Sequence, residues 1–126
     1  MRLLLDTVAF IFAVEDPHRL SKPAASALQD DNNILELSTV SLSELAIRAA
    51  SGKLRLSSDA ARQAIEDLGV RVLPFSAEHA FRLFSLPPYH RDPFDRQIIA
   101  QALEENIPVL TSDEKFRLYK GLRLVW

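Results

Sequence analysis

The sequence contains no cysteine, and this absence excludes two kinds of structural site. A chain without thiols forms neither disulfide bonds nor a thiolate zinc site, and such a composition is typical of a reducing compartment. We therefore expect a cytoplasmic location. The length of 126 residues allows one domain whose core needs no structural metal, so any bound metal is expected to serve function.

Long apolar runs and a surplus of positive charge are also missing. No stretch approaches the roughly 20 apolar residues that cross a bilayer, and Asp6 interrupts the apolar N-terminal segment. The formal net charge is -2, whereas proteins that bind nucleic acid indiscriminately usually carry a basic surplus. Any nucleic-acid substrate must therefore be held locally.

Positive residues do gather in two places along the chain. The first group comprises Arg48, Lys53 and Arg55, and the second comprises His90, Arg91 and Arg96. Solvated helix ends explain many such groups. The second group borders the consecutive prolines at residues 87–88, which predict an extended loop, so its side chains are candidates for contact with a nucleic-acid phosphate.

Strand-like and helix-like segments alternate along the chain. Short apolar runs predict strands over residues 2–5, 34–39, 70–73, 109–111 and 122–126. Apolar residues at helical spacing, preceded by capping residues, predict helices over residues 7–14, 23–29, 41–51, 59–68, 76–86, 93–105 and 112–119. This alternation, without a linker or an internal repeat, predicts a single α/β domain with a mainly parallel sheet covered by helices on both faces.

Four acidic residues lie at the starts of predicted helices, and each has a structural explanation. Asp6 is placed to cap the first helix, and Glu44 occupies the third position of a capping box that begins three residues earlier. Asp95 lies three residues after its predicted cap, Asp92, and Asp113 falls in the first turn of a helix, where the macrodipole favours negative charge. Taken singly, none of these residues demonstrates a site.

The four acids are more informative together. Asp6, Glu44 and Asp113 each follow a predicted strand, and Asp95 begins a further helix. Because the carboxyl ends of parallel strands meet at one edge of a sheet, we expect these side chains to converge there. Carboxylates this close repel one another, so they must take up protons or hold a cation.

A metal held by oxygen ligands indicates a particular chemistry. Carboxylates suit hard ions such as Mg²⁺ and Mn²⁺, while the absence of cysteine and the isolation of His18, His79 and His90 argue against zinc. Metal ions held by carboxylates lower the pKa of a bound water and stabilise the charge that develops on a phosphodiester. The residues therefore predict hydrolysis of phosphodiester bonds.

Four segments of the sequence also resemble a known family. They are LLLDT at residues 3–7, SLSELAIRAASGKLRL at 41–56, LPPYHRDPFDRQIIAQA at 86–102 and LTSDEKF at 110–116. These segments are similar to the PIN domain and, within it, to the VapC-type toxins of bacterial and archaeal toxin-antitoxin pairs. The likeness extends over nearly the whole chain and implies the three-layer α/β/α fold of that family.

The resemblance implies a role for each acid. It matches them to a quartet that binds Mg²⁺ or Mn²⁺ and activates water for cleavage of RNA, namely Asp6, Glu44, Asp95 and Asp113. Asp6 and Asp95 resemble the principal metal ligands. Thr7 and Ser112, beside Asp6 and Asp113, resemble hydroxyl residues that donate hydrogen bonds to the acids, and each is equally well placed to cap a helix. We assign Asp92 to helix capping.

By the same resemblance, the protein is expected to be an endoribonuclease toxin inhibited by a cognate antitoxin. A homodimer is expected, with an antitoxin that lays an apolar segment along a groove and sets a basic side chain near the acids. His90, Arg91 and Arg96 are then candidates for contact with RNA. Two alternatives stay open: a housekeeping RNA-processing nuclease without an antitoxin, and a degenerate domain that only binds RNA or protein.

Overall fold

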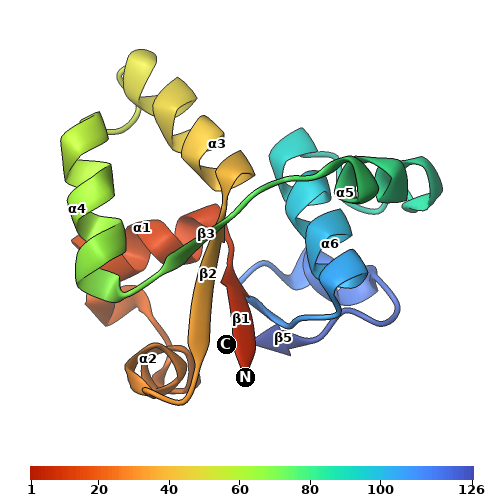
Figure 1. Ribbon diagram of the computed structural model, residues 1–126, viewed down its shortest axis with the longest axis horizontal. Helices are drawn as coiled ribbons and strands as arrows, with labels where there is room; N and C mark the ends of the chain where they lie inside the picture. The colour runs from red at the N-terminus through yellow and green to blue at the C-terminus, as the bar shows by residue number, and fades with distance from the viewer.

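Five parallel strands form the central sheet of the computed structural model, which describes residues 1–126. The strands are β1 (Arg2–Leu5), β2 (Ile34–Ser38), β3 (Arg71–Leu73), β4 (Val109–Leu110) and β5 (Leu124–Val125). Their order is β3-β2-β1-β4-β5, and every neighbouring pair is parallel (Figure 1). The predicted α/β class with a parallel sheet is confirmed.

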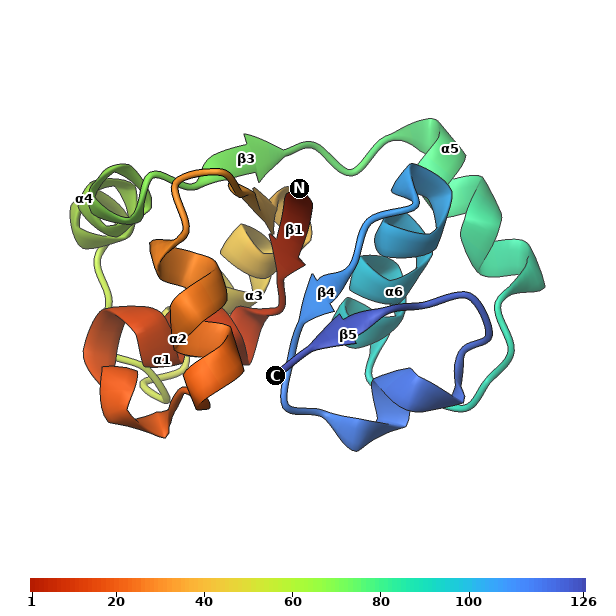
Figure 2. The same ribbon diagram turned by 90° about the horizontal axis from the view of Figure 1, so that it is seen from below.

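Helices cover both faces of this sheet. They are α1 (Thr7–Glu15), α2 (Lys22–Gln29), α3 (Thr39–Ala50), α4 (Ser58–Leu68), α5 (Ala77–Arg82) and α6 (Pro93–Glu105), with short 3-10 helices η1 (Pro17–Arg19), η2 (Leu83–Ser85) and η3 (Glu114–Leu118). Figure 2 shows α1 and α2 on one side of β1 and α6 on the other, as a three-layer fold requires. None of these helices combines the length and the apolar character that a membrane crossing needs.

The alternating side chains of β1 explain why the fold has two hydrophobic clusters. Leu3 and Leu5 face the cluster that contains Phe10 of α1, whereas Leu4 faces the cluster that contains Ile98 of α6. All three leucines are fully buried, so β1 is apolar at consecutive positions, as a strand covered on both faces must be.

The position of β1 also creates a switch point in the sheet. β2 and β3 extend from one side of β1, and β4 and β5 extend from the other. The N-H of Asp6 donates to the carbonyl of Leu110 over 3.1 Å, which joins the carboxyl ends of β1 and β4. In open parallel sheets, ligands bind outside the strand ends at such a point.

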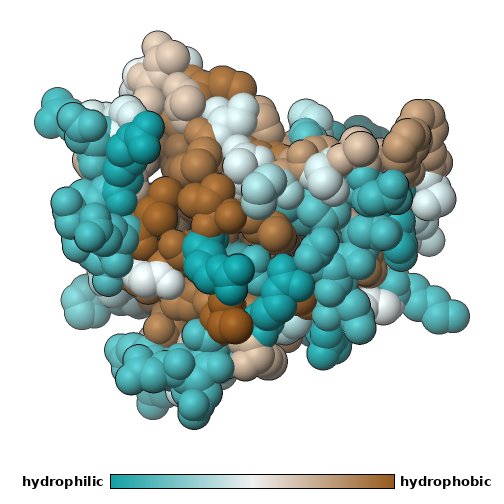
Figure 3. All heavy atoms as spheres, viewed as in Figure 1, coloured by the Kyte–Doolittle hydropathy of each residue, from teal (hydrophilic) through white to brown (hydrophobic).

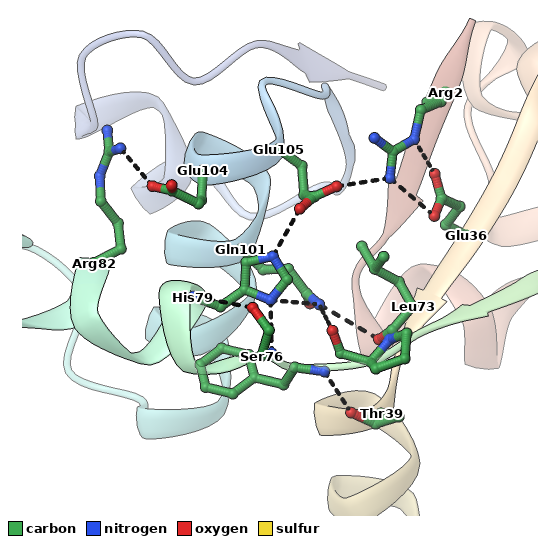
Figure 4. Close-up of polar contacts among 12 residues, drawn as sticks. Arg2, Glu36, Thr39, Leu73, Ser76, His79, Arg82, Gln101, Glu104 and Glu105 are labelled. Carbon is green, nitrogen blue, oxygen red and sulfur yellow. Dashed lines mark hydrogen bonds and ion pairs between the residues drawn. The ribbon is translucent and has the colours of Figure 1, made fainter.

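A chain of ion pairs lies at the other end of β1, near its first residue (Figure 4). Arg2, at the start of β1, contacts buried Glu36 of β2 at 2.5 Å and Glu105 of α6 at 3.0 Å. His79 of α5 completes the chain through Nε2, which lies 2.9 Å from Glu105 Oε2. These hydrogen bonds from His79 and Arg2 hold the pKa of Glu105 below its ordinary value. The network therefore ties α5 and α6 to the sheet at the end away from Asp6.

The predicted capping box at Ser41 is wrong. Helix α3 begins at Thr39, and its cap is Ser38, whose hydroxyl accepts the N-H of Val40 over 3.0 Å. Because Ser38 satisfies this N-H at the last residue of β2, the chain turns directly from strand into helix. Ser41 therefore lies inside α3, and Glu44 is a buried residue of its second turn rather than part of a cap.

Two other predicted helices are shorter than expected. The segment after Ser76 divides into α5 and η2, and its capping box is formed by Ser76 and His79. The expected helix over residues 112–119 is the 3-10 helix η3, and Asp113 is its cap rather than a residue of its first turn. The expected caps of α1, α2, α4 and α6 are all observed, at Asp6, Ser21, Ser57 and Asp92.

Candidate active site

Asp6 is the most buried of the four acids, and donors hold both of its carboxylate oxygens. As the cap of α1, its Oδ1 accepts the N-H of Ala9 over 2.7 Å, and its Oδ2 accepts the hydroxyl of Thr111 over 2.5 Å. Its side chain has little access to solvent, and this burial raises the pKa of Asp6 to about 6 despite the two hydrogen bonds. The carboxylate is thus fixed in orientation at the end of β1.

Thr111 links two of the acids and was not found from the sequence. Besides donating to Asp6, its hydroxyl accepts the backbone N-H of Asp113 over 3.0 Å. The pairing of Leu5 with Leu110 makes Thr111 the residue opposite Asp6 in the sheet, so the register of the two strands would have identified it. The predicted donor Ser112 is exposed, and no hydrogen bond of its side chain is present.

Thr7, the other predicted donor, contacts no acid. Its buried hydroxyl donates to the hydroxyl of Ser41 over 2.9 Å, which ties the start of α1 to the first turn of α3. Thr7 and Ser41 therefore fix the two helices that carry Asp6 and Glu44, and they act on the acids only through the backbone.

Asp95 and Asp113 meet at the ring of His90. Nε2 of His90 lies 2.8 Å from Asp113 Oδ2 and 3.2 Å from Asp95 Oδ2. Asp113 is held further because its Oδ1 accepts the N-H of Lys115 over 2.9 Å. Burial raises the pKa of Asp95 to about 8, and the negative charges of Asp92, Asp6, Glu44 and Asp113 add to this effect.

His90 is a fixed, buried donor, which the sequence did not indicate. Its backbone N-H donates to the hydroxyl of Tyr119 over 2.8 Å, and its ring packs edge-on against Phe116. Its Nδ1 accepts the N-H of Asp92 over 3.2 Å, so the ring hydrogen lies on Nε2 and points at the two carboxylates. The expected isolation of His90 and His79 is therefore wrong, because each histidine contacts a carboxylate.

Glu44 completes the cluster from α3. Its Oε2 lies 3.1 Å from Nη2 of Arg48, one turn further along the helix. Its Oε1 is buried and has no hydrogen-bond partner. The charge of Glu44 contributes to the raised pKa of both Asp6 and Asp95, so the structure brings all four predicted acids together.

These carboxylates fit a hard divalent cation. The unpartnered oxygen of Glu44 and the raised pKa values of Asp6 and Asp95 are both costs that a bound cation would remove. Ligand atoms of His90, Asp95 and Asp113 lie within 4.8 Å of one another, but the hydrogen on His90 Nε2 leaves the carboxylates as the ligands. An all-oxygen set is the one that Mg²⁺ and Mn²⁺ prefer.

Comparison with known proteins supports the same interpretation of the fold. The family model for the PIN domain matches residues 3–122. The chain belongs to the PIN domain family. Proteins with this domain are generally nucleases. Among curated proteins, none has a sequence similar enough to count as a match.

Several solved structures share this PIN fold. A VapBC complex from Rickettsia felis, bound to a promoter DNA fragment, matches with a TM-score of 0.73 and 22% identity, covering 98% of this chain and 97% of that one. DNA-bound VapBC from Salmonella typhimurium matches with a TM-score of 0.71 and 18% identity over 98% and 96% of the two chains. FitAcB from Neisseria gonorrhoeae matches with a TM-score of 0.62 and 22% identity over 97% and 95%.

The second group of basic residues, His90, Arg91 and Arg96, does not form one exposed patch in this PIN domain. His90 is buried beneath the acids, and Arg96 donates to the carbonyls of Leu86, Pro87 and His90 at 3.0–3.2 Å. Arg96 therefore holds the loop that carries His90, because a guanidinium can satisfy several carbonyls that proline-rich backbone leaves free. Arg91 is exposed, and its role as a contact for RNA stays a prediction.

Proposed function

We propose that this PIN domain is a metal-dependent endoribonuclease and the toxin of a toxin-antitoxin pair. The observation that carries the proposal is the cluster of Asp6, Glu44, Asp95 and Asp113 at the switch point of the sheet, in which Asp6 and Glu44 are buried. Membership of a family whose proteins are generally nucleases supports it.

Each acid has a proposed part in holding Mg²⁺ or Mn²⁺. Asp6 and Asp95 are the principal ligands, and the unpartnered Oε1 of Glu44 offers a third oxygen. When bound, the metal would lower the pKa of water and neutralise charge on the phosphodiester. Asp113, which is less buried than Asp6, is proposed to act through a water molecule.

The chain's other residues orient these carboxylates. Thr111 and the N-H of Ala9 keep Asp6 from rotating, and the Nε2-H of His90 does the same for Asp113. Preorganised ligands lose little entropy when a cation or a phosphate binds. The arrangement therefore favours binding of a cation in a single geometry.

Two substitutions test the nuclease. Asp6→Asn and Asp95→Asn keep the size of each side chain and remove its charge, so both are expected to abolish Mn²⁺-dependent cleavage of total RNA while circular dichroism remains that of a folded protein. Asp31→Asn, at an exposed turn away from the cluster, is the matched control and should keep full activity. Unchanged cleavage by both site variants would refute the proposal.

An apolar groove supports the proposed antitoxin contact. It lies between α3 and α4, has a volume of about 450 Å³, and is lined mainly by Leu42, Leu45, Ala46, Leu56, Ala61 and Ile65. Figure 3 shows apolar surface in this region. The similar solved structures include VapBC and other toxin-antitoxin complexes, so we propose that a cognate antitoxin lays an apolar segment in this groove and reaches the acids with a basic side chain.

Co-expression with the product of a short neighbouring reading frame tests this partner. Ala61→Glu places a charge in the groove and should weaken the complex at least tenfold without lowering RNA cleavage. Ala60→Glu, the adjacent position outside the groove, should leave the complex intact. A cleaving enzyme with no such neighbour would instead support an RNA-processing nuclease.

A homodimer is the remaining part of the proposal. Phe81 and Phe84 are 63% and 90% exposed, so neither side chain belongs to the core. Their rings lie 6.3 Å apart and offer apolar surface to a second copy. Sedimentation equilibrium should detect a dimer that Phe84→Ser weakens, and a monomer at all concentrations would contradict it.

A further inference from the structure

A second pocket lies beside the acids, between the C-terminal half of α3 and the start of α6. Its volume is about 430 Å³, and Glu44 forms part of its wall. Asp92, which caps the helix that carries Asp95, lines the same pocket. Any molecule held there therefore lies next to the acidic cluster.

The pocket lining holds two basic side chains as well as the acids Glu44 and Asp92, so its formal charge is balanced. Arg48 and Lys53 both line it. The Arg48 side chain is 41% exposed and uses one nitrogen on Glu44, so its other donors face solvent. Lys53 is exposed and forms no ion pair. Lys53 and the remaining donors of Arg48 therefore offer contacts for a phosphate that is not itself being cleaved.

The same pocket has an apolar part. Ile47 is 54% exposed, and Phe94 is partly buried against the core while it lines the pocket. A phosphate alone needs no apolar contact, whereas a nucleotide offers both a charged group and a flat base that stacks on aromatic rings. The pocket volume falls within the range of about 300–1,000 Å³ that holds small ligands, which suits one nucleotide.

We propose that this pocket binds the nucleotide next to the scissile phosphate of a single-stranded RNA. Arg48 and Lys53 hold its phosphate, and Phe94 and Ile47 contact its base. Arg48 also pairs with Glu44, so the same side chain would bind the RNA phosphate and position an acid of the cluster. This inference rests on the proposed ribonuclease function and deepens it by naming where the substrate lies.

Binding of a fluorescein-labelled, single-stranded RNA oligonucleotide in EDTA tests the pocket without cleavage. Lys53→Gln should weaken binding three- to tenfold. Loss of one phosphate contact should also reduce the slope of log affinity against log salt by about 0.7. Phe94→Leu keeps an apolar side chain in the core and removes the ring, so it should weaken binding without changing that slope.

Arg55→Gln is the matched control, because Arg55 is exposed on the same segment and does not line the pocket. It should leave affinity unchanged, and an equal loss in Lys53→Gln and Arg55→Gln would overturn the proposal in favour of diffuse charge. If Lys53→Gln weakens dimerisation or antitoxin binding and leaves RNA affinity unchanged, the pocket is a protein contact and the proposal also fails.

Cleavage assays separate this inference from the function on which it rests. If the native protein cuts RNA in Mn²⁺ while Lys53→Gln and Phe94→Leu retain its KM and its RNA affinity, only the pocket assignment fails. If the native protein cuts no RNA, the ribonuclease assignment fails, and the binding measurements in EDTA still decide what the pocket holds.

Discussion

The hydroxyl of Thr111 lies 2.5 Å from Oδ2 of Asp6, across the junction of β1 and β4. The hydroxyl oxygen of Thr111 in turn accepts the N-H of Asp113. One side chain therefore sets the relative positions of two acids that are 107 residues apart in the sequence. This relationship makes Thr111 the most informative residue to change outside the carboxylates.

Thr111→Val retains the shape of the side chain and removes its donor. A hydrogen bond to a charged group contributes about 1.5 kcal/mol or more, so we expect kcat/KM for RNA to fall about tenfold and Mn²⁺ to bind more weakly. Thr7→Val is the matched control, because Thr7 is an equally buried threonine whose hydroxyl donates to Ser41 and not to an acid. It should lower the melting temperature and leave Mn²⁺ affinity, measured by calorimetry, unchanged. A greater loss of Mn²⁺ affinity in Thr7→Val than in Thr111→Val would contradict the role of Thr111.

His90 and His79 form a second matched pair. In each, Nδ1 accepts a backbone N-H and Nε2 contacts a carboxylate, but only His90 lies among the four acids. His90→Ala and His79→Ala should each lower the free energy of unfolding by about 2 kcal/mol, because a buried donor is lost. Only His90→Ala should also weaken Mn²⁺ binding and reduce cleavage. Equal Mn²⁺ affinity in both variants would show that His90 has no effect on the site.

The metal-free protein should lose stability as pH rises. The pKa values of Asp6 and Asp95 in the folded chain are about 6 and about 8, against 3.8 for an unperturbed aspartate. Between about pH 4 and pH 8 the folded chain thus binds more protons than the unfolded chain, so the free energy of unfolding falls across this window. Urea unfolding in EDTA measures this slope, and Asp95→Asn should flatten it. A free energy that rises from pH 5 to pH 8 would contradict both pKa values.

Mn²⁺ should reverse that loss at pH 8. A ligand that binds only the folded state at a concentration of 100 times its Kd adds about 2.7 kcal/mol to the free energy of unfolding. The melting temperature should therefore rise on titration with Mn²⁺ in the native protein and stay constant in Asp6→Asn. A native protein that gains no stability from Mn²⁺ would exclude the acids as a metal site.

Arg91 and Arg96 should differ although they are close in sequence. Arg96→Gln removes donors to the carbonyls of the loop over residues 86–90, so it should lower the melting temperature by several degrees. Arg91→Gln changes only an exposed side chain and should leave stability unchanged while it raises KM for RNA. An unchanged KM in Arg91→Gln would remove the last predicted RNA contact of this group.

Most of the fold could be predicted because local signals and burial agree. Consecutive leucines in β1 indicated a strand covered on both faces, and Asp6, Ser57 and Asp92 marked helix starts correctly. Ser41 was misleading because the pattern Ser-x-x-Glu is the same inside a helix as at its start. The cap at Ser38 distinguishes the two here, because it starts the helix before Ser41 and leaves the Ser41 hydroxyl to Thr7, 34 residues away.

The acids could be found from the sequence and their supporting residues could not. Each acid follows a strand or a cap, which is a local property. The parts played by Thr111 and His90 depend on segments brought together by the sheet, since His90 meets Asp113 across 23 residues and Thr111 meets Asp6 across 105. Strand register would have identified Thr111 as a neighbour of Asp6. His90 lies in a loop that follows two prolines and precedes α6, and no such pairing rule predicts what a loop residue contacts.

The central position of β1 has a consequence for synthesis of the protein. β1 is made first, yet one of its two neighbours, β4, is made after residue 108. A nascent chain can therefore expose Asp6 and Glu44 to solvent long before Thr111 and Asp113 leave the ribosome. The order of the strands thus delays assembly of the cluster until β4 and the residues after it have been translated, so the proposed ribonuclease site is incomplete in every shorter nascent chain.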